Sequence, residues 1–179
     1  MPTERLPRLP RALALAALPL PLAPLSAALG LVVRRMVRAH PAMLRRLGPP
    51  AGLRFLIDAT DLPFVFLLHP AAPALTAHRR ARAPAHDARL AGPLSAFLAM
   101  MHGAEDGDAL FFSRDLTVEG DTAAVLALRN AMDDAELDLT EALAATGGPL
   151  AAPLRQALAG AERVTGLTLH RIETKGQWP

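Results

Sequence analysis

The chain has 179 residues, enough for one domain with a hydrophobic core, and 51% of them are hydrophobic whereas only 4% are aromatic. The absence of cysteine excludes disulfides, thiolate metal sites and a cysteine nucleophile, and it is compatible with a reducing, cytoplasmic setting. The formal net charge is only +2, but residues 1–100 hold thirteen arginines and four acidic residues, whereas residues 101–179 hold six basic and thirteen acidic residues.

Residues 1–24 form an apolar arm that is rich in proline and leucine. Three arginines precede an apolar run over residues 12–25, an order that also resembles a secretion signal. The run is too short to span a bilayer, and three prolines would break a helix within it: Pro19, Pro21 and Pro24. We therefore interpret the segment as an arm of the domain, with a secretion signal as the alternative.

Residues 25–47 follow a helical pattern with one apolar and one basic side. The apolar side holds Leu25, Leu29, Val32, Met36, Met43 and Leu47. The basic side holds Arg34, Arg35, Arg38, Arg45 and Arg46. Pro41 is expected to kink this helix or to divide it into two. Either the apolar side packs on the core and the basic side faces water, or the basic side rests on anionic lipid headgroups.

A turn at residues 48–52 ends the helical region. Beyond it, the apolar pattern predicts strands within residues 53–62, 63–69 and 74–80, and a short fourth strand at 87–92. Pro93 then opens a helix, because its missing N–H costs nothing in a first turn. The apolar stripe of this helix consists of Leu94, Phe97, Leu98 and Met101.

A phenylalanine pair, Phe111 and Phe112, precedes a predicted fifth strand in which apolar residues at 116 and 118 alternate with polar residues at 117 and 119. Gly120 permits a tight exit from the strand, and Asp121 is placed to cap the next helix by accepting a backbone N–H. The inward positions of that helix are Val125, Leu128 and Met132.

The sequence shows no catalytic constellation. Its six histidines lack metal-ligand spacing, and it contains no phosphate-binding glycine loop. Ser95 lacks the Gly-x-Ser-x-Gly context of a hydrolase nucleophile, so a small hydrolase or thioesterase that uses Ser95 and His102 is only an alternative. We expect no enzyme activity, no metal and no cofactor. Nucleic acid is an unsuitable partner because the basic half lacks interleaved aromatic residues, whereas an anionic membrane surface suits it.

The strand that runs through Gly120 and Asp121 into an Ala/Leu-rich helix resembles the lipid-binding domain of sterol carrier protein type two. Residues 108–137 resemble more closely the bacterial UbiT-like accessory factors of ubiquinone biosynthesis, and the resemblance extends over roughly residues 18–145. It implies an α+β fold, in which an open, mostly antiparallel sheet of about five strands is covered by helices and a hydrophobic cavity lies between them. Residues 48–145 would then be the lipid-binding core, and residues 146–179 a C-terminal helix and tail.

The resemblance also implies a function, which is to carry or present polyprenylated ubiquinone precursors, or another lipid, to enzymes of the oxygen-independent pathway. The partners would be ubiquinone biosynthesis proteins, including iron–sulfur hydroxylation proteins, and the location the cytoplasm or the periphery of the inner membrane. We expect the core and cavity wall to consist of Phe64, Phe66, Leu94, Phe97, Leu98, Met101, Phe111, Phe112, Leu128 and Met132. The alternative is a membrane-surface scaffold that docks a biosynthetic complex through the basic residues of the N-terminal region.

Overall fold

The computed structural model describes residues 8–19, 21–102 and 116–133. Their strands are β1 (Phe55–Ala59), β2 (Phe64–His69), β3 (Ala74–Arg79), β4 (Ala88–Gly92) and β5 (Thr117–Gly120). Their helices are α1 (Arg11–Ala16), α2 (Leu22–Ala39), α3 (Pro41–Leu47), α4 (Leu94–His102) and α6 (Thr122–Asp133), with short 3₁₀ helices η1 (Pro49–Gly52) and η2 (Arg80–Arg82). Every strand therefore lies within a segment in which the apolar pattern predicts one.

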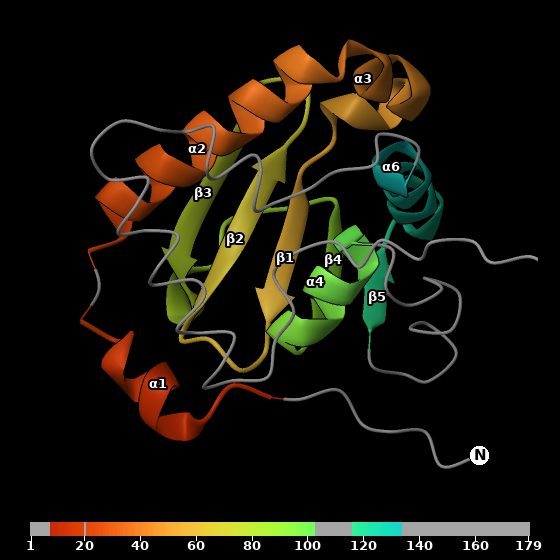
Figure 1. Ribbon diagram of the computed structural model, residues 1–179. Coiled ribbons are helices and arrows are strands. Elements are labelled where there is room, and N and C mark those ends of the chain that lie inside the picture. Colours follow the sequence, from red (N-terminus) through yellow and green to blue (C-terminus); the bar gives the residue numbers. More distant parts are fainter. Residues whose placement is uncertain (1–7, 20, 103–115, 134–179) are drawn as a thin grey trace, which may run out of the picture.

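The strands form one open sheet in the order β3-β2-β1-β4-β5 (Figure 1). Neighbouring strands are antiparallel except β1 and β4, which are parallel. The parallel pair arises because the chain crosses over the sheet between β3 and β4, and η2 begins this crossover. The predicted α+β fold with an open, mostly antiparallel sheet is confirmed.

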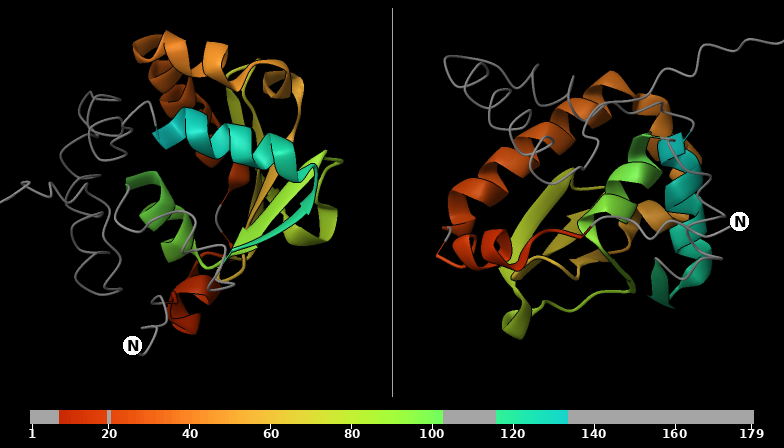
Figure 2. Two further views of the ribbon diagram at one scale, coloured as in Figure 1. Left: turned by 90° about the vertical axis from the view of Figure 1, so that its right-hand side faces the viewer. Right: turned by 60° about the horizontal axis from the view of Figure 1, so that its bottom comes forward.

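Helices cover the sheet from one side and along one edge. α4 and α6 lie on one side of the sheet, whereas η2 lies on the other (Figure 2). α2 runs beside the edge strand β3, where Ser26 Oγ accepts a hydrogen bond of 2.9 Å from the Ala77 N–H. This bond satisfies an amide of an edge strand, which would otherwise be open to another chain.

Pro41 divides the amphipathic segment, because α2 ends at Ala39 and α3 begins at Pro41. The apolar side faces the domain, since Val32 is 4% and Leu47 only 2% exposed. The apolar side therefore packs on the core, and contact of the basic side with lipid stays a prediction. α2 begins at Leu22, ahead of the predicted start, because proline is tolerated in a first helical turn. None of the described helices combines the length and the apolar character that crossing a bilayer requires.

Two aspartates fix the starts of the helices that cover the sheet. Asp121 Oδ1 accepts a hydrogen bond of 2.9 Å from the Ala124 N–H, so Asp121 caps α6 as predicted. Asp61, in the turn between β1 and β2, caps α4 from a distant part of the chain. Its Oδ1 accepts a hydrogen bond of 2.9 Å from the Leu94 N–H. The start of α4 is thereby anchored to the turn at one end of the inner strands β1 and β2.

Candidate functional site

One face of the sheet is apolar across its full width. Successive strand partners on this face form a continuous row of Ala77, Phe66, Ile57, Leu90 and Val118. A second row beside it contains Leu75, Leu68, Phe55 and Ala88. We call these two rows the apolar face. Residues of α4 and α6 pack into the same hydrophobic cluster, so the apolar face is the side on which those helices lie.

The structure brings together the predicted ligand-contacting residues that it describes. Five belong to the cluster on the apolar face: Phe66, Leu94, Phe97, Leu128 and Met132. Phe64 joins them through Phe66, with the two ring centroids 5.5 Å apart in an edge-to-face arrangement. Leu98 and Met101 lie in α4, but their side chains are outside the description, and Phe111 and Phe112 lie outside the described residues.

Burial separates two groups among these residues. Phe64 and Phe97 are each 6% exposed and Leu128 is 5% exposed, so these side chains are packed into the domain. Phe66, Leu94 and Met132 are only partly buried against the cluster. The second group therefore has surface left with which to contact a ligand, whereas the first group forms the core behind it.

Sequence reasoning left some residues of the apolar face out of the predicted site. Ile57 and Leu68 are partly buried against the same cluster and are direct neighbours of Phe66 and Phe55 across β1 and β2. The alternation in β1 was a sufficient signal for Ile57, because it follows Phe55 at the two-residue period of a strand. Leu68 lies in a run of apolar residues, where alternation cannot show which face a side chain occupies.

The opposite face carries charged residues near the crossover. Asp58 is 2% exposed and binds Arg80 and Arg89, with 2.6 Å between Asp58 Oδ2 and Arg89 Nη2. Arg89 also binds the exposed Glu119 at 2.8 Å, and Arg80 donates hydrogen bonds to the carbonyl oxygens of Ala59 and Leu62. These contacts hold η2 against the sheet. The opposite face is thus mixed, since it carries this charged cluster and also the buried apolar Leu56 and Val65.

Both arginines act on the ionisation of Asp58. Burial of the Asp58 carboxylate opposes its ionisation, but hydrogen bonds and charges from Arg89 and Arg80 outweigh burial, so the pKa of Asp58 is below its ordinary value. The hydrogen bonds of Arg89 to Asp58 and Glu119 raise the pKa of that guanidinium. Asp58 and Arg89 are therefore charged at neutral pH, and the cluster that they form is structural in character.

The predicted membrane-contacting arginines lie on the outer sides of α2 and α3. Arg34, Arg38, Arg45 and Arg46 are exposed, and Arg35 is partly buried. Their exposure agrees with both arrangements predicted for this segment, a solvated basic side and a side that rests on lipid. The contact with a membrane itself remains a prediction.

The described residues give the hydrolase alternative no support. Ser95 is 5% exposed in the first turn of α4, and within the described part of the chain its hydroxyl has no hydrogen-bond partner. A nucleophilic serine needs a base within hydrogen-bond reach. The described residues also contain no group of three or more histidine, aspartate or glutamate side chains that could hold a metal ion.

Comparison with known proteins identifies the family. The SCP-2 sterol transfer family matches residues 34–133. No curated protein matches the chain. Among solved structures, one described as a UbiJ-SCP2 ubiquinone synthesis protein has a TM-score of 0.54 and 19% identity, over 67% of this chain and 98% of its own.

Sterol carrier protein 2 from Yarrowia lipolytica in its apo form has a TM-score of 0.42 and 14% identity, over 59% of this chain and 87% of its own. The sterol carrier protein domain 2 of Helicoverpa armigera has a TM-score of 0.40 and 11% identity, over 57% and 86%. The predicted resemblance to sterol carrier protein type two is confirmed by the family match, which spans more than half of the sequence. The chain belongs to the SCP-2 sterol transfer family.

Proposed function

We propose that this protein is a lipid-binding accessory protein that carries or presents polyprenylated ubiquinone precursors to biosynthetic enzymes. The observation that carries the proposal is the apolar face, an unbroken row of apolar side chains across five strands with partly buried Phe66 in it. Membership of a sterol transfer family supports a lipid as the ligand. A structural neighbour described as a ubiquinone synthesis protein supports the pathway.

The physical basis is the cost of an exposed polyprenyl tail. Apolar surface costs ~25 cal/mol per Å² in water, so a long tail must remain in a membrane or be sheltered by a protein. A wall of Phe66, Leu94 and Met132 offers such shelter without any group that makes or breaks bonds. The polar head group would remain accessible to the enzyme that modifies it. The protein is therefore proposed to act by binding alone.

The oxygen-independent branch and partners such as the iron–sulfur hydroxylation proteins belong to the same proposal through the UbiT-like resemblance. A deletion strain grown with and without oxygen tests the branch. Relative to wild type, the ubiquinone content of the deletion strain should fall in the culture without oxygen and be unchanged in the culture with oxygen. The same change relative to wild type in both cultures would contradict this part of the proposal. It would not affect the proposal that the protein binds lipid.

Mass spectrometry of the lipids extracted from gently purified protein tests the ligand. We expect near-stoichiometric polyprenyl-phenol or quinone species. Adjacent residues of β2 supply a matched pair of variants, because Phe66 lies on the apolar face and Leu67 on the opposite one. Phe66→Gln should weaken lipid binding roughly tenfold, since the contact of a partly buried phenylalanine contributes about 1.4 kcal/mol.

Leu67→Gln should retain the lipid, and Phe66→Leu should retain most of it because the side chain stays apolar. Circular dichroism and urea unfolding identify any variant that fails to fold. An equal loss of lipid in folded Phe66→Gln and Leu67→Gln would contradict binding at the apolar face. A wild-type protein that carries only phospholipid would contradict the proposed ligand.

A membrane-surface scaffold is a second candidate, favoured by the exposed arginines of α2 and α3. Removal of residues 1–47 is unsuitable as a test, because Val32 and Leu47 are buried in the domain. Replacement of Arg34, Arg38 and Arg45 by glutamine leaves the core intact. If the scaffold candidate is correct, flotation with anionic vesicles should weaken strongly, since each arginine near such a surface contributes about 1 kcal/mol. Unchanged flotation would exclude these arginines as the anchor.

A further inference from the structure

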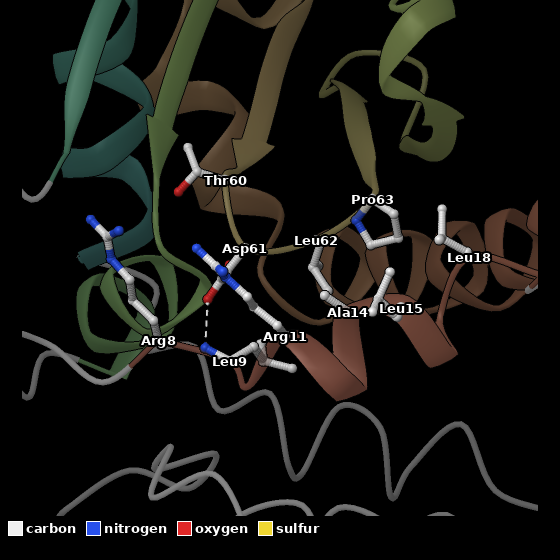
Figure 3. A pocket seen from close by; sticks show the side chains of 10 residues that line it. All are labelled: Arg8, Leu9, Arg11, Ala14, Leu15, Leu18, Thr60, Asp61, Leu62 and Pro63. Atoms are coloured by element: carbon white, nitrogen blue, oxygen red, sulfur yellow. Dashed lines mark hydrogen bonds between the residues drawn. The ribbon is translucent and has the colours of Figure 1, made fainter.

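A hollow of about 480 Å³ lies between the chain around α1 and the turn that joins β1 to β2 (Figure 3). Residues 8–18 form one wall and residues 60–63 the other. The first wall precedes the residues that match the sterol transfer family, so the site is an addition to the family domain. Its volume is within the ~300–1,000 Å³ that is typical of small-molecule sites.

The hollow has a basic end and an apolar end. Figure 3 shows Arg8 and Arg11 toward one side and Leu15, Leu18 and Pro63 toward the other. Leu15 is 63% and Leu18 48% exposed, which is unusual for large apolar side chains that are close together. Such a division of polarity fits a ligand with a charged head and an apolar chain.

The lining of the hollow carries two arginines, Arg8 and Arg11, and one carboxylate, that of Asp61. Within the described part of the chain, neither Arg8 nor Arg11 forms an ion pair. Asp61 is the acidic residue of the lining, and both of its carboxylate oxygens already accept backbone hydrogen bonds. Oδ2 accepts one of 3.0 Å from the Leu9 N–H, and Oδ1 accepts one from the Leu94 N–H. The arginines are therefore available to an anion.

We propose that this hollow binds a single-chain anionic amphiphile of the fatty-acid type. The carboxylate is held by Arg8 and Arg11, and the chain lies along Leu15, Leu18 and Pro63. This site is separate from the apolar face of the sheet, so the inference does not depend on the proposed carrier function. It gives the protein a second, smaller lipid site with a charge requirement.

The test uses the full-length protein and sodium dodecanoate below its micelle concentration, with binding measured by calorimetry. Arg8→Gln combined with Arg11→Gln should weaken binding about tenfold or more, because the carboxylate of the ligand loses its charge-assisted hydrogen bonds to both guanidinium groups. Arg54→Gln combined with Arg82→Gln is the matched control, since it removes the same charge from exposed positions that do not line the hollow. The control should leave the affinity within about twofold of wild type.

A dodecanoate with a photoreactive diazirine near its tail locates the site. Adducts on residues 14–18 or 62–63 are expected, and they should disappear when unlabelled dodecanoate competes. Adducts confined to β2, α4 or α6 would overturn the inference, because the apolar face would then be the only site. Absence of dodecanoate binding, or binding of anionic vesicles alone through Arg8 and Arg11, would overturn it as well.

Discussion

Gly120 lies so close to the backbone of Asp87 that no other residue fits in its place. A Cβ at position 120 would collide with the Asp87 carbonyl oxygen and lie 3.2 Å from the Ala88 Cα. Gly120 also has a φ of +82°, in the region that favours glycine. The same Asp87 carbonyl oxygen accepts the Asp121 N–H at 3.3 Å. This contact joins the start of β4 to the end of β5 and directs the chain into α6.

Gly120→Ala should therefore destabilise the fold by about 3 kcal/mol, from backbone strain and from the collision together. Gly52→Ala is a suitable control, because a Cβ at that position would meet nothing within 4 Å and Gly52 has no positive φ. The control should change the free energy of unfolding by less than about 1 kcal/mol. Urea unfolding measures both values. A Gly120→Ala variant as stable as Gly52→Ala would show that the backbone can move apart here at little cost.

Asp58 is the central acceptor on the opposite face, and its loss should be costly. Asp58→Asn leaves Arg80 and Arg89 with a weaker acceptor, so we expect a loss of about 2–3 kcal/mol in the free energy of unfolding. The arginines are 41% and 30% exposed and can turn toward water, which keeps the loss moderate. Glu119→Gln, at an exposed partner of Arg89, should cost less than about 1 kcal/mol. Equal losses of unfolding free energy in Asp58→Asn and Glu119→Gln would mean that the burial of Asp58 adds nothing to the strength of its ion pairs.

Acid should abolish the contribution of the Asp58 carboxylate to the stability of the fold. Its pKa is lowered in the folded state, so the ionised carboxylate stabilises the fold fully at pH above about 4, the ordinary range of an unfolded aspartate. That contribution is lost as the pH falls through the lowered folded-state pKa. The difference in unfolding free energy between wild type and Asp58→Asn should thus be constant near pH 7 and shrink below about pH 4. A difference that grew on acidification would contradict the ion pairs.

Elements whose signals are local could be predicted from the sequence. Buried Leu116, directly before β5, and partly buried Val118 in β5 alternate with exposed Thr117 and Glu119, as the predicted two-residue period requires. α6 follows in the same way, since Asp121 caps it and its inward positions 125 and 128 are buried. In each case a few neighbouring residues decide the structure, because burial of one side suffices.

Relationships between distant segments could not be predicted in this way. Nothing near Asp58 indicates that Arg89 will be its partner, because the parallel pairing of β1 with β4 places them on one face. Phe97 is buried whereas Phe66 is only partly buried, and this difference in exposure likewise depends on which distant segments pack against each side chain. The sequence does not predict α1, because a helix of six residues is too short to show a helical period and several prolines follow it.

The hydrogen bond from the Leu9 N–H to Asp61 Oδ2, at 3.0 Å, ties the N-terminal segment to the turn that also caps α4. Leu9→Pro removes this N–H, whereas Leu9→Ala keeps it and trims the side chain. We expect trypsin to cleave after Arg11 several times faster in Leu9→Pro than in Leu9→Ala, because release of the segment exposes that bond. Unfolding of the whole domain in urea should be nearly unchanged in both variants. Equal cleavage rates in the two variants would show that the Leu9 amide does not hold α1 in place.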